Sequence, residues 1–326
     1  MNRLLAEPLM VAAARERHKG LVWIVEILVF YAVYSVASML EMLVIAAGAG
    51  VAVAVTPEST QAIATAVQGG NFFDIYDVII ATLRYQPTLT MLLNLFCTIA
   101  SIGVCLLFCR VIQKRSLYSV GFDGHGFIKE YLLGLGTGAV MLCLTVGGVL
   151  ALKGGSIGLA GNTGFIILLY AAGYMIQGAA EEILCRGYFM TSFARRHPLW
   201  LSILLSSVMF GLLHIFNDGF GLLPFINITL VGICFALLTV RRGNLWIACA
   251  AHSVWNFLQG NFFGISVSGT SLSESVFRVN LDGSTLLTGG GFGIEGSIVT
   301  TVVMVAAILM ILFLLPKRRA AFPEEA

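Results

Sequence analysis

The stretch IILLYAAGYMIQGAAEEILCRGYF, residues 166–189, places charged side chains in the middle of a long apolar segment. It is long enough to cross the hydrocarbon core of a bilayer, which takes about 20 apolar residues in a helix. Within it, however, stand two adjacent carboxylates, Glu181 and Glu182, and the guanidinium of Arg186. Charged side chains at membrane depth are costly to insert and usually mark function. The sequence must therefore supply either partners for these charges or a reason to dismiss them.

The composition of the whole chain is that of a membrane protein. Of 326 residues, 58% are hydrophobic and 11% are charged, and the mean hydropathy is +0.92. Soluble domains carry about 25% charged residues. The net charge of +2 gives no reason to expect nucleic acid as a partner. All seven cysteines fall in apolar runs without a CxxC pair, so neither a disulfide framework nor a cysteine zinc site is indicated.

Eight apolar stretches predict an all-α, polytopic membrane protein with about eight transmembrane helices. Cytoplasmic loops of such proteins are rich in Lys and Arg. If the N-terminus is cytoplasmic, eight spans bring the C-terminus to the same side, and every basic cluster then falls on that side. We therefore expect both termini to be cytoplasmic. The predicted spans are 21–50, 89–112, 131–151, 163–193, 199–216, 222–240, 244–260 and 297–316.

The spans divide the chain into three parts. Residues 1–130 form a tail, two spans and their loops, residues 131–260 a helical core, and residues 261–326 an outer loop and the last span. The outer loop, 261–296, is rich in glycine, serine and threonine, and it is predicted to be irregular. A second outer stretch, FFDIYDVIIATL at 72–83, is predicted to be an amphipathic helix on the membrane surface.

The spacing of the charges in the fourth span separates the roles of its two carboxylates. Residues four apart on a helix lie on one face, so Glu182 and Arg186 can form an ion pair. Glu181 is rotated by about 100° from Glu182 around the helix axis. We therefore expect Arg186 to neutralise Glu182 while Glu181 faces a cavity.

Two histidines lie at membrane depth in other spans. His214 closes the fifth span, four residues after Phe210. His252 lies in the seventh span and shares a helix face with Asn256. At about 1.5 Å per residue, Glu181, His214 and His252 lie about 21, 27 and 15 Å inward from the basic ends of their helices. Helix tilt can absorb this spread, so three helices can present these residues to one buried pocket.

The motifs E-E-I-L-C-R (181–186), F-G-L-L-H (210–214) and H-S-V-W-N (252–256) resemble those of the CPBP family, the membrane-embedded CAAX-type proteases and their bacterial relatives formerly grouped as Abi proteins. The family patterns are EExxxR, FxxxH and HxxxN/D, and all three occur here in order without substitution. The resemblance covers residues 160–260, approximately. It implies that residues 131–260 contain the catalytic core of an intramembrane endopeptidase that forms no covalent intermediate.

Carried over residue by residue, the resemblance implies that Glu181 activates the attacking water and that His214 and His252 complete the site. The other motif residues would orient or support them, namely Asn256, Glu182, Arg186 and Phe210. Amide hydrolysis needs a base for water, stabilisation of the oxyanion and a proton for the leaving amine, and these residue types can supply all three.

A zinc ion is an open alternative. Glu181, His214 and His252 would offer zinc a carboxylate and two imidazoles with one position free. The sequence contains no HExxH, however, and these ligands would come from three helices. We favour metal-independent activation of water by Glu181.

Two functions from other classes also stay open. One is a proton-coupled transporter in which Glu181 and the histidines relay protons, although no internal repeat supports it. The other is a non-catalytic scaffold or bacteriocin-immunity protein that binds a partner in the same cavity. For the protease we expect a membrane-associated peptide or protein as substrate. We also expect an integral location in the lipid bilayer of a bacterial cell membrane, with access to the site from the cytoplasm as the resemblance implies.

Overall fold

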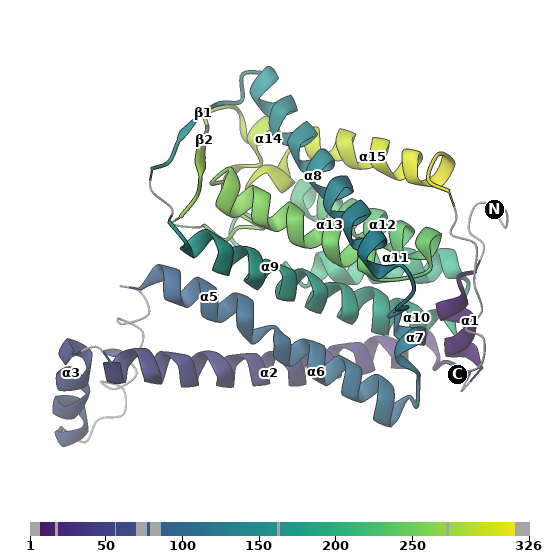
Figure 1. Cartoon of the computed structure of the whole chain (residues 1–326), viewed down its shortest axis with the longest axis horizontal. Helices are drawn as coiled ribbons and strands as arrows, with labels where there is room; N and C mark the ends of the chain where they lie inside the picture. The colour runs from purple at the N-terminus through teal and green to yellow at the C-terminus, as the bar shows by residue number, and fades with distance from the viewer. Residues whose placement is uncertain are drawn as a thin grey trace.

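The computed structural model describes residues 7–16, 19–55, 57–69, 77–78, 86–161, 164–271 and 274–316. These residues are almost entirely helical, as an all-α polytopic membrane protein requires (Figure 1). The surface helix predicted at 72–83 lies largely outside the described residues, and so do the basic residues after position 316.

A helix stands at each of the eight predicted spans. Four helical runs are long and apolar enough to cross a membrane, those at 23–52, 87–112, 127–151 and 222–242, and the apolar helices at 199–212 and 298–313 are shorter. The bounds are α2 (Trp23–Val55), α5 (Pro87–Cys97), α6 (Ile99–Leu107) with η1 (Phe108–Ile112), α8 (Phe127–Ala151), α9 (Ile166–Glu182) with η2 (Ile183–Met190) and α10 (Thr191–Ala194), α11 (Leu199–Leu212), α12 (Leu222–Arg242), α13 (Trp246–Phe257) with η3 (Leu258–Phe262), and α15 (Ile298–Phe313).

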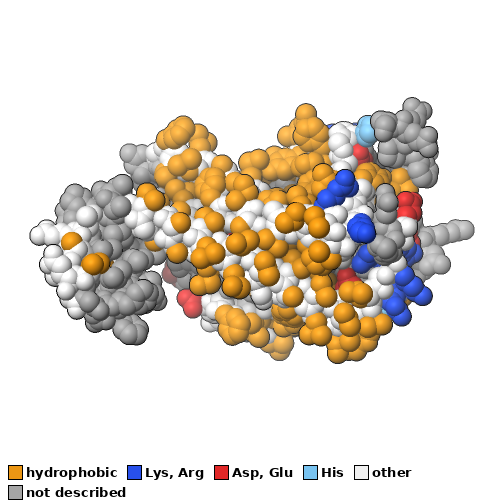
Figure 2. All heavy atoms as spheres, turned by 90° about the horizontal axis from the view of Figure 1, so that it is seen from below, with side chains coloured by type: hydrophobic (Ala, Val, Ile, Leu, Met, Phe, Trp, Pro, Cys, Tyr) orange, Lys and Arg blue, Asp and Glu red, His pale blue; other side chains and the backbone are white. Residues whose placement is uncertain are grey.

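The helices form a bundle in which α13 is central. It packs against α8 on one side and α9 on the other, and α9 in turn contacts α5 of the layer formed by α2, α5 and α6 (Figure 1). The short helices α1 (Leu9–Arg15) and α7 (Leu117–Val120) gather with α10 at one end of the bundle, and α3 (Pro57–Gln68) lies at the opposite end. Figure 2 shows that the face on the side of α2 is covered with apolar side chains, as contact with lipid requires.

Two predictions about the outer connections need correction. The fifth helix ends at Leu212 rather than at 216, and the chain turns there, so His214 lies just beyond the helix. The segment 261–296 is ordered over most of its described length, not irregular. Its strand β2 (Phe277–Leu281) pairs antiparallel with β1 (Gly155–Leu159), and α14 (Thr285–Thr288) and the 3-10 turns η4 (Gly290–Phe292) and η5 (Ile294–Gly296) follow.

Two glycines on α8 bring its backbone against that of α13. A Cβ atom on Gly134 would lie 2.3 Å from the carbonyl oxygen of Ile247, and one on Gly138 would lie 2.3 Å from that of Ala251. Both distances are far inside van der Waals contact. Small residues four apart are a common means of close packing between membrane helices. The backbone next to His252 is therefore held by α8, although α8 places no side chain in the site.

We predict that Gly138→Ala lowers the free energy of unfolding by about 1–3 kcal/mol, the usual cost of overpacking, because α13 must move away from α8. Gly136→Ala is the matched control, since nothing lies within 4 Å of a Cβ atom built there. That change should be neutral, or stabilising by up to about 1 kcal/mol through helix propensity. Thermal unfolding of the two variants in detergent measures the difference, and equal stabilities would contradict the prediction.

Candidate active site

The acidic pair lies where the fourth span changes its helical form. Glu181 and Glu182 end α9, and the next eight residues, including Arg186, continue as the π-helix η2. All eight residues of η2 are buried. Such π-helical segments within α-helices are frequent at functional sites. The motif therefore occupies an interior, locally distorted part of the span.

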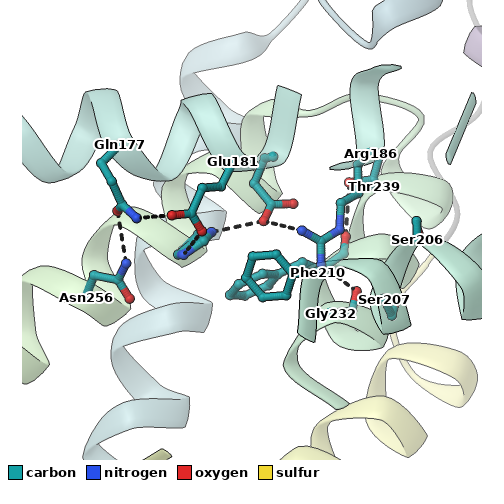
Figure 3. A network of polar contacts seen from close by, with 12 residues as sticks. Gln177, Glu181, Arg186, Ser206, Ser207, Phe210, Gly232, Thr239 and Asn256 are labelled. Atoms are coloured by element: carbon teal, nitrogen blue, oxygen red, sulfur yellow. Dashed lines mark hydrogen bonds and ion pairs between the residues drawn. The ribbon is translucent and has the colours of Figure 1, made fainter. Parts of the chain in front are cut away.

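Glu182 and Arg186 form the predicted ion pair. Nη1 of Arg186 donates to Oε1 of Glu182 at 2.8 Å, and neither side chain has any solvent exposure. Arg186 also donates from Nη2 to the carbonyl oxygen of Gly232 on α12, at 3.0 Å. Its guanidinium carbon lies 4.6 Å from the centre of the Phe210 ring on α11. One buried cation thus connects three helices (Figure 3).

His252 on α13 lies between the two carboxylates. Its Nδ1 is 3.0 Å from Oε1 of Glu182, and since an ionised carboxylate only accepts, Nδ1 carries the hydrogen. Its Nε2 faces Oε2 of Glu181 at 3.6 Å. The imidazole stacks on Phe235 at 5.2 Å between ring centres and meets the Phe210 ring edge-on at 5.8 Å. The ring is therefore fixed with one nitrogen toward each acid.

His214 reaches the same region from the turn after α11. Its Nδ1 lies 2.8 Å from the carbonyl oxygen of Phe210, so Nδ1 is the donor and Nε2 keeps a free lone pair in the neutral ring. The Phe210 ring lies 5.0 Å from the His214 ring. Phe210 thus contacts both histidines and Arg186, which accounts for the spacing of F-G-L-L-H.

These residues surround one cavity of about 360 Å³. Glu181, His214, His252 and Asn256 all line it, whereas Glu182 and Arg186 lie behind the lining. The side chain of Glu181 is 28% exposed, and that of Glu182 is fully buried. Oε2 of Glu181 is itself buried and accepts no hydrogen bond from the described residues. The two neighbouring carboxylates therefore occupy different environments, as their spacing predicts.

Gln177 is a site residue that the sequence reasoning did not assign. Its Nε2 donates to Oε1 of Glu181, and its Oε1 accepts from Nδ2 of Asn256 at 3.0 Å (Figure 3). Its position four residues before Glu181, on the same face of α9, could have identified Gln177 as a partner of Glu181. Gln177 binds one oxygen of Glu181 and leaves the other, which faces Nε2 of His252, without a hydrogen bond from the described residues.

Glu295 adds another carboxylate to the lining, from the segment before α15. Its Oε2 accepts from the backbone nitrogen of Ser268 at 2.5 Å and from the Ser268 hydroxyl at 2.9 Å. Burial raises the pKa of Glu295, while the bonds from Ser268 and the charge of His214 act to lower it. No motif marked this residue, because its partners lie far away in the chain.

The arrangement does not match a zinc site. Among the residues that the structure describes, no three His, Cys, Asp or Glu side chains are grouped closely enough to hold a metal ion.

The fold and the buried polar cavity define an integral membrane protein with acid–base groups set among its helices. Residues 163–258 match the family described as Type II CAAX prenyl endopeptidase Rce1-like. This match supports an assignment to the CAAX protease, or CPBP, family of intramembrane endopeptidases. The match lies within the core predicted at 131–260 and includes all three motifs. No curated protein and no solved structure matches the chain.

We predict that Arg186→Gln destabilises the protein by about 3–5 kcal/mol, because it leaves the charge of Glu182 buried without a partner. Thermal unfolding in detergent measures the loss. Removing both charges, in Glu182→Gln with Arg186→Gln, should restore part of the stability, since no uncompensated charge then remains.

Arg110→Gln is the control for this comparison, because Arg110 is exposed and its replacement should change stability by no more than about 0.5 kcal/mol. If the single Arg186 variant were as stable as the Arg110 variant, the ion pair would not support the site.

Proposed function

We propose that the chain hydrolyses a peptide bond of a membrane-associated peptide or protein, with Glu181 as the base that activates water. The observation that carries this proposal is Oε2 of Glu181, a buried acceptor without a hydrogen bond from the described residues, in a cavity large enough for water and a peptide group. Oε2 of Glu182 is also buried without a hydrogen bond from the described residues, but Glu182 does not line the cavity, and its Oε1 binds Arg186 and His252.

The proposed reaction needs only water and the peptide. A water molecule at Oε2 of Glu181 gives one proton to the carboxylate while its oxygen bonds to the carbonyl carbon of the substrate. The electron pair of the carbonyl double bond moves to the carbonyl oxygen and forms an oxyanion. Glu181 then passes the proton to the amide nitrogen as the carbon–nitrogen bond breaks, which leaves a carboxylic acid and an amine.

Several side chains would assist these steps. Protonated His252 can donate from Nε2, and Asn256 keeps a second amide hydrogen beyond the one that binds Gln177, so both can stabilise the oxyanion. The free lone pair on Nε2 of His214 can accept from the water or from the substrate amide. These interactions are strong in a cavity enclosed by apolar helices, where little water competes.

We predict that Glu181→Gln lowers cleavage by about 10²–10⁴-fold, the contribution of a general base, without loss of the folded protein. The measurement compares the peptide termini of the membrane and secreted proteomes between cells with the wild type, cells with the variant and cells without the gene. Termini found only with the wild type would name the substrate.

Glu26→Gln is the matched control. Glu26 is also a fully buried carboxylate in a membrane helix, but it does not line the cavity, so its variant should give wild-type termini. If Glu181→Gln also gave wild-type termini, Glu181 would not be the base. If termini were the same in cells with and without the gene, the non-catalytic scaffold and the transporter would become the better hypotheses.

We further predict that membranes carrying the wild type produce the same termini after treatment with o-phenanthroline, a zinc chelator, because the site residues act without a metal. A loss of these termini that added zinc restores would show that Glu181, His214 and His252 rearrange to bind the ion. The non-chelating isomer m-phenanthroline serves as the control for general damage to the membranes.

A further inference from the structure

Charge distinguishes the two ends of the bundle. Basic side chains gather at the end where α1, α7 and α10 meet, and Figure 2 shows Lys and Arg concentrated toward this end. Arg15 binds the carbonyl oxygen of Ala194 there at 2.7 Å, and Arg242 binds Glu130. Since positive residues favour the cytoplasmic side, this end is assigned to the cytoplasm.

The cavity is built largely from the opposite half of the bundle. Met91 and Asn94 line it from the first two turns of α5, whereas Arg110, at the basic end, lies farther along the same helical run, in η1. His214 and Asn217 line it from the turn beyond α11. Among the described residues, no side chain of α1, α7 or α10 belongs to the lining.

The segment that closes this half of the cavity is held in place by its own polar contacts. Besides its two bonds to Glu295, Ser268 accepts at its carbonyl oxygen from Nδ2 of Asn217 at 2.8 Å. The backbone nitrogen of Gly269 donates to the carbonyl oxygen of Phe292 at 3.0 Å. Val267 and Ser268 are thereby fixed as the outer wall of the cavity.

The lining reaches the molecular surface at two places in the same half. Thr270 is exposed at the edge of the outer wall, and Asn94 is exposed on α5. Thr270 lies in the segment after η3, and Asn94 lies in the helical run 87–112, which is long and apolar enough to span a membrane.

We infer that the site is reached from the non-cytoplasmic side, and that its substrates are exported, membrane-associated polypeptides cleaved near their outer membrane boundary. This inference rests on the proposed protease function. It differs from the cytoplasmic access that the family resemblance implied, because the lining comes from the half of the bundle away from the basic residues.

The lining also limits the chemistry of the substrate. It contains the carboxylates of Glu181 and Glu295 and the amides of Gln177, Asn94 and Asn217, but no lysine or arginine among the described residues. Amide side chains can bind a peptide backbone through both donors and acceptors. Acidic groups next to the scissile bond would be repelled. The cleaved segment is therefore neutral or basic.

The test uses a trimethylammonium-bearing methanethiosulfonate, which is permanently charged and does not cross membranes. Single cysteines are introduced by Thr270→Cys at the mouth, by Glu181→Cys in the cavity and by His125→Cys at the basic end, where the His125 side chain is 78% exposed. All are made in a Cys143→Ser background, because Cys143 is the exposed native cysteine and the other six are buried. The background chain without an added cysteine is the blank.

In right-side-out vesicles we expect the reagent to modify the Thr270→Cys and Glu181→Cys variants and to leave the His125→Cys variant unmodified, with the reverse in inside-out vesicles. Modification of Glu181→Cys only in inside-out vesicles would overturn the inference, and so would modification of His125→Cys from outside. Access to Thr270→Cys but not to Glu181→Cys from outside would also overturn it. Labelling needs no catalysis, so failure of the proteolysis experiment is a separate result.

Discussion

The contact of α13 with the backbones of its two neighbours is the constraint on which the site depends. Gly134 and Gly138 of α8 allow α13 to pack closely against α8. On the other side of α13, a Cβ atom on Gly178 of α9 would lie 2.6 Å from the Ser253 hydroxyl. A side chain at Gly134 or Gly138 would move α13 away from α8, and one at Gly178 would move it away from α9. His252 would then no longer reach both acids at 3.0 and 3.6 Å. Three residues without side chains thus determine the distances between residues that carry chemistry.

The paired acids show how one helix supports two different carboxylates. Arg186 and His252 both bind Oε1 of Glu182, whereas Gln177 binds one oxygen of Glu181. Because Arg186 also binds Gly232 on α12 and contacts Phe210 on α11, the same cation fixes the walls of the cavity. A buried ion pair is poor evidence of stabilisation by itself. Here the ion pair orients the two carboxylates, because it holds Glu182 behind the lining and leaves Glu181 facing the cavity.

Much of this arrangement could be predicted from the sequence, because it depends on local spacing. The spans follow from apolar runs, and the Glu182–Arg186 pair follows from a separation of four residues. The family motifs indicated which helices meet. Glu295 and Ser268 could not be predicted, since their contact joins distant parts of the chain and no periodic pattern encodes it. The pairing of β1 with β2 was missed for the same reason, and the glycine-rich composition around β2 suggested irregular structure instead.

The length of α2 has a consequence for the setting in which the protein works. Its 33 residues span about 50 Å, whereas the hydrocarbon core of a typical bilayer measures about 30 Å. A helix with this excess adjusts by tilting, and the tilt varies with the thickness of the surrounding lipid. Because α2 packs on α5 and α6, and α5 contributes Met91 and Asn94 to the cavity, a change in tilt moves one wall of the site. The acyl chain length of the membrane lipids thereby affects the width of the cavity and the ease with which a polypeptide enters it.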